Sequence, residues 1–263
     1  MSRYDEMFQR LAQRNEAAFG AFLMLGDPDP ATSATHLDAC VRGGADMIEV
    51  GIPFSDPIAD GPVIQAASVR ALANGAKVND AFARIAELRA KHPAVPIGIL
   101  TYANLLMARG EARFMADAKA AGADSILIAD VPSLEVEPYA KWAKEAGLDL
   151  VMIAATNTAP DKLATIARLS AGYTYCVARA GVTGMRDDLD LDHGALFAGL
   201  AEAGAPPPVL GFGISTPEHV AAAVASGVAG VISGSAIVKL VTQPDSTASI
   251  EAFVASMKAA TAR

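Results

Sequence analysis

The stretch Gly44-Ala45-Asp46-Met47-Ile48-Glu49-Val50 recurs in this 263-residue chain as Gly122-Ala123-Asp124-Ser125-Ile126-Leu127-Ile128. The same order of residue types returns at 147–153 and, more loosely, at 227–232. A Gly just past the end of a helix adopts the left-handed conformation without a Cβ penalty. Each copy therefore predicts a helix end, a glycine cap and a strand. The nearly continuous apolar runs are typical of a parallel sheet that is covered on both faces.

Eight strands of this kind are expected along the chain, at 19–25, 46–51, 96–101, 125–129, 148–153, 173–178, 208–211 and 229–233. Helical patterns lie between them, for example at 31–42, 78–91, 112–121, 135–146 and 217–226. Alternating strand–helix units in a chain of about 250 residues favour a single-domain (β/α)₈ (TIM) barrel over residues 1–263. An open, doubly wound sheet is the less favoured alternative.

Two further helices belong to the expected architecture. An amphipathic helix over 4–14 carries Met7, Phe8 and Leu11 at helical spacing and is expected to close the bottom of the barrel. A short helical run at 236–240 follows the eighth strand, where barrels commonly build a phosphate site.

The composition argues against several classes of function. A net charge of −8 and a sequence pI near 5.0 disfavour a nucleic-acid-binding or anionic-membrane surface. The N-terminus is too polar for a signal peptide, and no run approaches the ~20 apolar residues of a membrane span, so a cytoplasmic protein is expected. Cys40 and Cys176 lie far apart and are expected to be buried, reduced thiols. The 4 histidines lack ligand spacing, so no metal is expected.

Glu49 is a carboxylate within the otherwise apolar second strand. Burial raises the pKa of a carboxyl group, and carboxyl groups with raised pKa values carry out proton transfer near neutral pH. The alternative is a buried ion pair, but the nearby chain has no basic residue closer than Arg42. Active sites of barrels lie at the C-terminal ends of the strands, so Glu49 is the leading candidate for a catalytic acid or base.

The segment after this strand, Pro53-Phe54-Ser55-Asp56-Pro57-Ile58-Ala59-Asp60-Gly61-Pro62, is a long loop of the kind that closes over a ligand. Asp60 lies near the start of the next helix, so it is either an N-cap or a residue of the pocket. The pattern alone leaves these two interpretations at even odds. Asp56 could likewise form a turn or face the pocket.

Glycine-bearing turns follow three strands and indicate a phosphate site. They read Arg179-Ala180-Gly181-Val182-Thr183-Gly184, Gly211-Phe212-Gly213-Ile214-Ser215 and Ser233-Gly234-Ser235. Glycines let the backbone approach an anion, and the start of a helix adds unpaired N–H donors. Ser215-Thr216-Pro217-Glu218 also resembles a simple capping box. Two such turns in the places where barrels bind phosphate, together with the short helix, favour phosphate binding.

Several other candidates have a default role in the core. Tyr175 in the sixth strand is more often a core aromatic than a catalytic group, although a buried hydroxyl needs a partner. Thr183 could be an ordinary loop residue. Other strand residues could form an apolar wall for an aromatic ligand where they lie near the strand ends: Phe22, Leu100, Leu127, Ile153 and Ile232.

At this level of detail the motifs closely resemble those of the tryptophan synthase α subunits. The resemblance is carried by 48–62, 179–184, 211–215 and Ile232-Ser233-Gly234-Ser235-Ala236-Ile237-Val238-Lys239, which occur without gaps and in the family's order. It extends over essentially the whole chain, including the N-terminal helix.

The resemblance implies a carbon–carbon lyase reaction of L-tryptophan biosynthesis, the retro-aldol cleavage of indole-3-glycerol phosphate to indole and glyceraldehyde 3-phosphate. Glu49 matches the family's acid/base residue. Asp60 matches the carboxylate that accepts a hydrogen bond from the indole N–H. Tyr175 matches a residue of the catalytic pocket near Glu49.

The resemblance also assigns substrate-binding positions. The indole pocket is implied at Phe22, Leu100, Leu127 and Phe212. The phosphate-binding positions are implied at Gly184, Gly213, Gly234 and Ser235. Thr183 matches the loop residue that meets the Asp60 loop when the site closes.

A partner is implied as well, because family members work with a β subunit in an α₂β₂ tetramer. No cofactor is expected in this chain, and pyridoxal phosphate is expected only in the β subunit. Leu105 and Ala155 stand where the family usually has proline, and the first of them lies in a region that contacts the β subunit. A free-standing indole-3-glycerol phosphate lyase is therefore the alternative, whereas the intact Asp56 and Asn104 region favours the α subunit.

Two other classes are less favoured. Related phosphate-binding barrels of histidine or tryptophan biosynthesis generally place Lys or Asp at other strand ends, and the first five strands here lack Lys and Arg. A non-catalytic barrel that only binds a partner would not need both Glu49 and Asp60.

Overall fold

The computed structural model describes residues 1–177, 193–211 and 213–263. Within these residues a parallel sheet of 9 strands has the order β5-β4-β3-β2-β1-β9-β8-β7-β6. The strands are β1 (Ala18–Met24), β2 (Met47–Gly51), β3 (Ile97–Thr101), β4 (Ser125–Ile128), β5 (Asp149–Leu150), β6 (Met152–Ala155), β7 (Thr174–Val177), β8 (Pro208–Leu210) and β9 (Gly230–Ser233).

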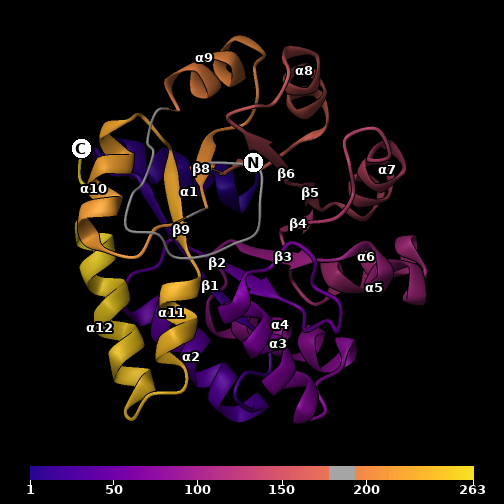
Figure 1. Cartoon of the computed structure of the whole chain (residues 1–263), viewed down its shortest axis with the longest axis vertical. Helices are drawn as coiled ribbons and strands as arrows, with labels where there is room; N and C mark the ends of the chain where they lie inside the picture. Colours follow the sequence, from indigo (N-terminus) through magenta and orange to yellow (C-terminus); the bar gives the residue numbers. More distant parts are fainter. Residues whose placement is uncertain (178–192, 212) are drawn as a thin grey trace.

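Helices follow the strands along the chain, and apart from α1 they lie around the outside of the sheet (Figure 1). They are α1 (Arg3–Gln13), α2 (Pro30–Arg42), α3 (Pro62–Ala73), α4 (Val78–Lys91), α5 (Ala103–Arg109), α6 (Glu111–Ala120), α7 (Glu137–Ala146), α8 (Pro160–Leu169), α9 (Gly194–Glu202), α10 (Pro217–Ala225), α11 (Ser235–Leu240) and α12 (Ser246–Ala259).

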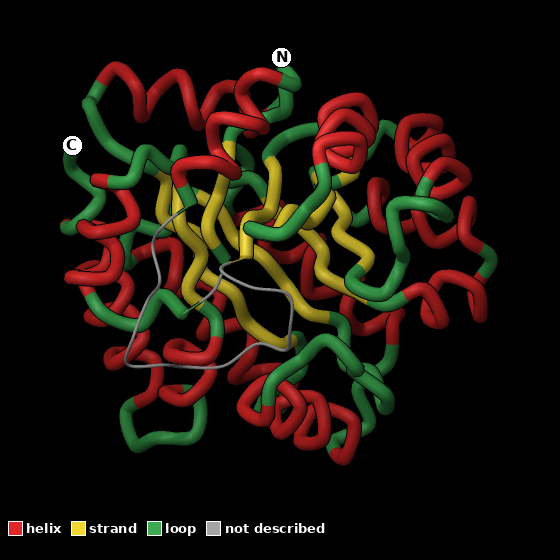
Figure 2. Tube along the Cα trace, turned by 45° about the horizontal axis from the view of Figure 1, so that its top comes forward, coloured by secondary structure: helices red, strands yellow, loops and turns green. Residues whose placement is uncertain are grey.

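The sheet closes on itself at its fifth unit. β5 pairs with β4, and β6, which follows after the single residue Val151, pairs with β7. The amide of Val151 itself donates to the carbonyl of Ile126 at 2.9 Å. The strand expected at 148–153 is therefore present in two pieces, one on each neighbour. The predicted (β/α)₈ barrel is confirmed, with strands enclosed by helices (Figure 2).

The glycines of the recurring phrase take the predicted left-handed conformation. Gly44, Gly122, Gly147 and Gly227 have φ angles of 97°, 100°, 77° and 96°, and they follow the ends of α2, α6, α7 and α10. A side chain with a Cβ is strained in this conformation. These positions therefore let the chain turn directly from an outer helix into an inner strand.

Strand register places the candidate residues side by side. Glu49 on β2 is paired with Phe22 on β1 and with Gly98 on β3. Gly98 is in turn paired with Ser125 on β4. Laterally paired residues of a parallel sheet point to the same face, so these positions share the inside of the barrel.

α1 covers the N-terminal end of the barrel, as predicted. Tyr4, Met7 and Leu11 on one face of this helix are buried. The Tyr4 hydroxyl is 2.8 Å from Oγ of Ser125, at the first residue of β4. The helix begins with a capping box in which the Asp5 N–H donates to Ser2 Oγ and the Ser2 N–H donates to the Asp5 carboxylate.

Other expectations concern thiols, metals and membranes. Cys40 and Cys176 are buried and free. In the described part of the chain, no group of three or more His, Cys, Asp or Glu residues is placed to hold a metal ion. None of the helices in that part has the length and apolar character that crossing a bilayer requires.

Candidate active site

A cleft opens at the C-terminal ends of the strands and has about 520 Å³ of space unfilled by protein atoms, part of it open to solvent. Its lining combines two carboxylates, an apolar wall and two glycine-bearing turns: Phe22, Glu49, Asp60, Ile64, Leu100, Tyr175, Gly211, Gly213, Ile214, Ile232, Gly234, Ser235 and Ala236. Eight of the predicted site residues are in this lining. The fold therefore brings together residues from five strands that are far apart in the sequence.

Glu49 is 3 % exposed in the middle of β2. Burial raises its pKa to about 7, although a hydrogen bond from Tyr173 lowers it, and the negative charge of Asp60 also raises it. No Lys or Arg of the described residues is among these influences, so the ion-pair alternative has no support. A carboxyl group with such a pKa is present in both protonation states near neutral pH, so it can both donate and accept a proton.

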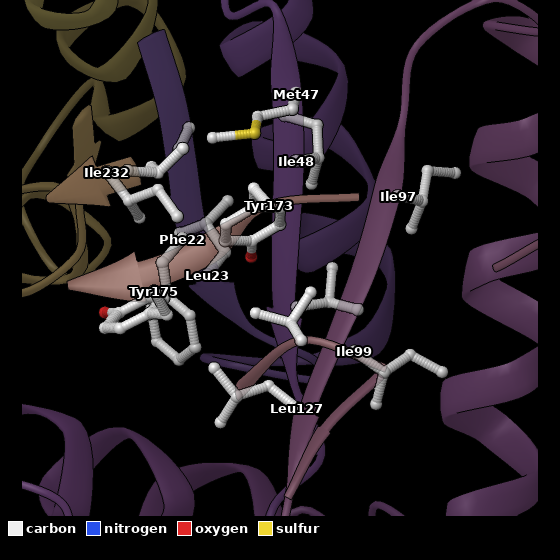
Figure 3. Packing of buried hydrophobic residues seen from close by; sticks show 14 of the residues in the cluster. Phe22, Leu23, Met47, Ile48, Ile97, Ile99, Leu127, Tyr173, Tyr175 and Ile232 are labelled. Atoms are coloured by element: carbon white, nitrogen blue, oxygen red, sulfur yellow. The ribbon is translucent and has the colours of Figure 1, made fainter. Parts of the chain in front are cut away.

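Two tyrosines lie near Glu49: Tyr175 in β7, and Tyr173 in the turn directly before that strand. The Tyr173 hydroxyl donates to Oε1 of Glu49 at 3.0 Å, and the Tyr175 hydroxyl donates to the carbonyl of Gly211 at 2.8 Å. Sequence analysis singled out Tyr175, but the tyrosine bonded to Glu49 is Tyr173. Both rings lie among the buried side chains inside the barrel (Figure 3). Burial raises the pKa of both phenols well above the usual value, so both hydroxyls remain protonated donors.

Asp60 is 5 % exposed and lines the same cleft. Burial raises its pKa to about 6, and a hydrogen bond with Tyr102 lowers it. The N-cap of α3 is Gly61, with no side-chain capping bond, so the N-cap interpretation of Asp60 is wrong. Asp60 is therefore a pocket residue, and its pKa of about 6 lies below the value of about 7 for Glu49.

The glycine-bearing turns form the opposite part of the lining. Gly213 has a φ of 75°, and Gly234 precedes Ser235, the first residue of α11. The Ser233 hydroxyl donates to the carbonyl of Ile214 at 2.7 Å and so joins the two turns. Backbone N–H groups in such turns and at a helix start attract anions.

The apolar wall is made by Phe22, Leu100, Ile64 and Ile232. The predicted Leu127 is 2 % exposed in β4 and lies outside this lining, next to its register partner Leu100. Ile153 on β6 is 39 % exposed and lines a neighbouring hollow between β4, β6 and α8. The remaining predicted residues, Thr183, Gly184 and Phe212, lie outside the described residues.

Sequence reasoning missed Tyr102 and Tyr173. A signal for Tyr102 existed, because it directly follows β3 and a polar aromatic residue at a strand end faces the mouth of a barrel. Tyr173 and Tyr175 are two residues apart and share a strand face, so the sequence alone does not tell which hydroxyl reaches Glu49.

Comparison with known proteins agrees with these features. The model of the tryptophan synthase alpha chain family matches residues 8–262. The tryptophan synthase alpha chain of Shewanella amazonensis is 47 % identical over 266 residues, which cover 99 % of this chain and 100 % of that protein. The tryptophan synthase alpha chain of Aeromonas hydrophila is 46 % identical, with 100 % of both chains covered.

Solved structures are similar over the same length. Tryptophan synthase subunit alpha from Legionella pneumophila has a TM-score of 0.90 and 29 % identity, with 99 % of this chain and 98 % of that chain covered. A chain of Mycobacterium tuberculosis tryptophan synthase has a TM-score of 0.91 and 29 % identity, with 100 % and 99 % covered. Fold and site together define a (β/α)₈-barrel enzyme with two buried carboxyl groups at its mouth. The chain belongs to the tryptophan synthase alpha chain family.

Proposed function

We propose that this chain cleaves indole-3-glycerol phosphate to indole and glyceraldehyde 3-phosphate, as the α subunit of tryptophan synthase in L-tryptophan biosynthesis. The observation that carries the proposal is the pair of buried carboxyl groups, Glu49 and Asp60, in one cleft with glycine turns suited to a phosphate. Membership of the family supports the same reaction.

Cleavage requires three coupled changes. The indole C3 gains a proton, the C3′ hydroxyl of the glycerol chain loses one, and the bond between C3 and C3′ breaks. The electron pair of that bond returns to the ring, and C3′ becomes the aldehyde carbon. Glu49 can give the first proton and take the second, because its pKa of about 7 makes both protonation states accessible.

Asp60 has the complementary role. When C3 is protonated, positive charge develops on the indole nitrogen, and an ionised carboxylate that accepts the N–H hydrogen bond stabilises this charge more than it stabilises the ground state. Its lower pKa of about 6 keeps Asp60 ionised while Glu49 still carries a proton. The two environments therefore favour different roles for two similar groups.

The other site residues are proposed to bind the two ends of the substrate. Tyr175 belongs to the catalytic pocket, where its hydroxyl fixes the turn at Gly211. The indole ring is assigned to Phe22, Leu100 and Phe212, and to Leu127, which lies beside Leu100 but outside the cleft lining. The phosphate is assigned to Gly184, Gly213, Gly234 and Ser235. Thr183 is assigned to closure over the Asp60 loop.

The proposed reaction needs no cofactor in this chain, because a carboxyl group serves both proton transfers. Pyridoxal phosphate is assigned to the β-subunit partner, and the protein is placed in the cytoplasm. The absence of a candidate membrane-spanning helix from the described residues is consistent with that placement.

A β-subunit partner in an α₂β₂ tetramer is supported by apolar side chains around the mouth of the barrel. Ile58, Met107 and Leu134 are 72 %, 59 % and 78 % exposed. They follow β2, β3 and β4, so they lie in neighbouring connections at the same end of the barrel as the cleft. We take this end of the barrel, with its three exposed apolar side chains, as the face to which the β subunit binds. Leu105 packs against the core, so its departure from proline leaves this surface in place.

Indole release from indole-3-glycerol phosphate by the purified chain, with and without a tryptophan synthase β subunit, tests the proposal. Slow release that the β subunit strongly stimulates is expected, whereas fast and unstimulated release would support the free-standing lyase. Glu49→Gln should lower indole release by about 100-fold or more while phosphate binding is retained. Wild-type activity in this variant would remove Glu49 from the mechanism.

A further inference from the structure

The turn at residues 213–215, called here the phosphate turn, is held from behind by a side chain that the mechanism has not used. His219 lies in the first turn of α10, and its Nδ1 is 3.1 Å from the carbonyl oxygen of Gly213. The same atom is 3.2 Å from Oγ of Ser215 and 3.4 Å from its backbone nitrogen. One imidazole nitrogen therefore contacts both ends of the phosphate turn.

The middle of this turn is held from another element. The hydroxyl of Ser233, a completely buried residue at the end of β9, donates to the carbonyl of Ile214 at 2.7 Å. Side chains from α10 and β9 thus contact the polar groups of three consecutive residues. Gly213 itself has a φ of 75° and no side chain, so these contacts supply the restraint that its own backbone lacks.

Either neutral tautomer of His219 can serve this purpose. With a proton on Nδ1 the ring donates to the Gly213 carbonyl, and without it the same nitrogen accepts from the N–H or hydroxyl of Ser215. The capping of α10 is a separate contact, in which the backbone N–H of His219 donates to Oγ1 of Thr216 at 3.3 Å. A substitution of the imidazole therefore removes the hold on the turn but retains the N-cap.

We propose that His219 is a positioning residue that presets the phosphate turn for the phosphate of the substrate. The proposal rests on the proposed function only in taking the phosphate to lie against Gly213. A preset turn orients its backbone donors before binding, whereas a loose turn must be ordered when the ligand arrives, so loss of the restraint weakens binding. Because His219 lies behind the turn and not in the cleft lining, it does not touch the reacting atoms.

His219→Leu and His219→Asn separate this role from simple packing. Leu fills the space without a hydrogen-bonding group, whereas the side-chain amide of Asn places a polar atom as many bonds from Cβ as Nδ1. Inorganic phosphate binding, measured by calorimetry in the absence of turnover, should weaken about five- to tenfold in His219→Leu. It should stay within about twofold of wild type in His219→Asn. The KM for indole-3-glycerol phosphate should follow phosphate affinity, with kcat nearly unchanged.

Wild-type phosphate affinity in His219→Leu would overturn the proposal, as would equal weakening in His219→Leu and His219→Asn. Circular dichroism establishes that each variant is folded, and His219→Ala, which suits a helix, replaces His219→Leu if that variant is not. If wild-type protein binds phosphate but releases no indole, the proposed reaction fails while the result for His219 still stands. If wild-type protein binds phosphate and releases indole but the His219 variants do not show the expected phosphate affinities, only the positioning role fails.

Discussion

At the scale of single residues, the proposed chemistry depends on the pKa of Glu49, which sets how readily this carboxyl group gives up and takes back a proton. Burial favours the neutral acid, while the hydroxyl of Tyr173 donates to one carboxylate oxygen and favours the ionised form. The balance of these two effects, with the negative charge of Asp60 beside them, gives a pKa of about 7. Near neutral pH, a buried carboxyl group without the Tyr173 hydrogen bond would keep its proton too firmly to act as a base. A carboxyl group in water would be ionised and would have no proton to give.

Tyr173→Phe tests this balance. Removal of a donor to the carboxylate should raise the pKa of Glu49, so the limb of the kcat–pH profile that reports this group should move to higher pH. Tyr175→Phe is the matched control, because the Tyr175 hydroxyl donates to Gly211 and not to Glu49. A limb that does not move in Tyr173→Phe, or that moves equally in Tyr175→Phe, would contradict the assignment.

Burial of Glu49 also has a consequence for stability. The folded-state pKa of about 7 exceeds the ordinary value of 4.5, so the folded protein binds the extra proton between these pH values and stability falls as pH rises through them. Glu49→Gln removes this cost. The free energy of unfolding of Glu49→Gln minus that of wild type should be about 2 kcal/mol higher at pH 8.5 than at pH 5.5, so the variant gains stability relative to wild type as pH rises. Urea unfolding of both proteins measures this, and a pH-independent difference would argue against the raised pKa.

The same residues show where sequence reasoning ends. A carboxylate in an apolar strand is visible in the sequence because it violates the strand pattern, so Glu49 was found. Asp60 fitted two local roles equally well, and only the contact with Tyr102 and the cap at Gly61 decided between them. Tyr173 and Tyr175 share one face, and the choice between them depends on how β7 is staggered relative to β2 across the barrel.

At the scale of elements, the lateral pairing of β2, β3 and β4 places a glycine, Gly98, where the hydroxyl groups of Ser125 and Tyr4 need space. Gly98 lies between Glu49 and Ser125, and a Cβ at this position would come within 2.8 Å of Ser125 Oγ and 3.1 Å of the Tyr4 hydroxyl. The missing side chain thus leaves space for hydroxyl groups that come from α1 and β4. Tyr4 in turn packs on Tyr173, with ring centroids 5.3 Å apart.

Gly98→Ala should therefore destabilise the protein by about 1–3 kcal/mol, because the crowded atoms are buried in the barrel interior. The effect should be smaller in a Ser125→Ala background, where the nearest atom is absent. A double-mutant cycle on the free energy of unfolding gives the coupling between the two positions. Additive effects would show that Gly98 is needed for some reason other than space for this hydroxyl.

Element boundaries were predictable where a local rule determines them. The glycine caps fixed the helix–strand junctions, because a positive φ strongly prefers glycine. The helix expected at 112–121 begins at Glu111, directly after Gly110 with a φ of 85° and the preceding α5. The division of the fifth strand was not predictable, since it arises from pairing with two different neighbours during barrel closure.

At the scale of the whole molecule, the contacts of the C-terminus lie at the end of the barrel opposite the cleft. The cleft lies at the C-terminal ends of the strands, whereas the C-terminal residue meets the connection between α1 and β1 at the other end. There the Asn15 side chain donates to the carbonyl of Arg263 at 2.6 Å, and the Arg263 N–H donates to the carbonyl of Asn15 at 2.9 Å. Lys258 of α12 joins the same region, with Nζ 2.8 Å from Glu16 and 2.9 Å from Asp46.

Lys258→Met should therefore reduce stability without reducing catalysis. Asp46 is only 8 % exposed, and burial raises its pKa while the Phe19 N–H, Lys258 and Arg10 lower it. Loss of the ammonium group leaves this buried carboxylate with the Phe19 N–H at 2.9 Å and the Arg10 guanidinium at 3.8 Å. A loss of about 2–3 kcal/mol is expected at pH 8, with kcat within about twofold of wild type. The deficit should shrink as pH falls and Asp46 becomes protonated, because the penalty belongs to the ionised form.

Lys141→Met is the matched control for this prediction, since it removes an ammonium group from a surface pair in which Lys141 and Glu145 are 73 % and 59 % exposed. Exposed pairs of this kind contribute little, so this change should cost less than about 0.5 kcal/mol. Urea unfolding and indole release, measured on both variants, decide the question. Equal stability losses in the two variants would mean that the contact at Asp46 is as weak as a surface pair. A large fall in kcat with Lys258→Met would instead mean that the two ends of the barrel are energetically coupled.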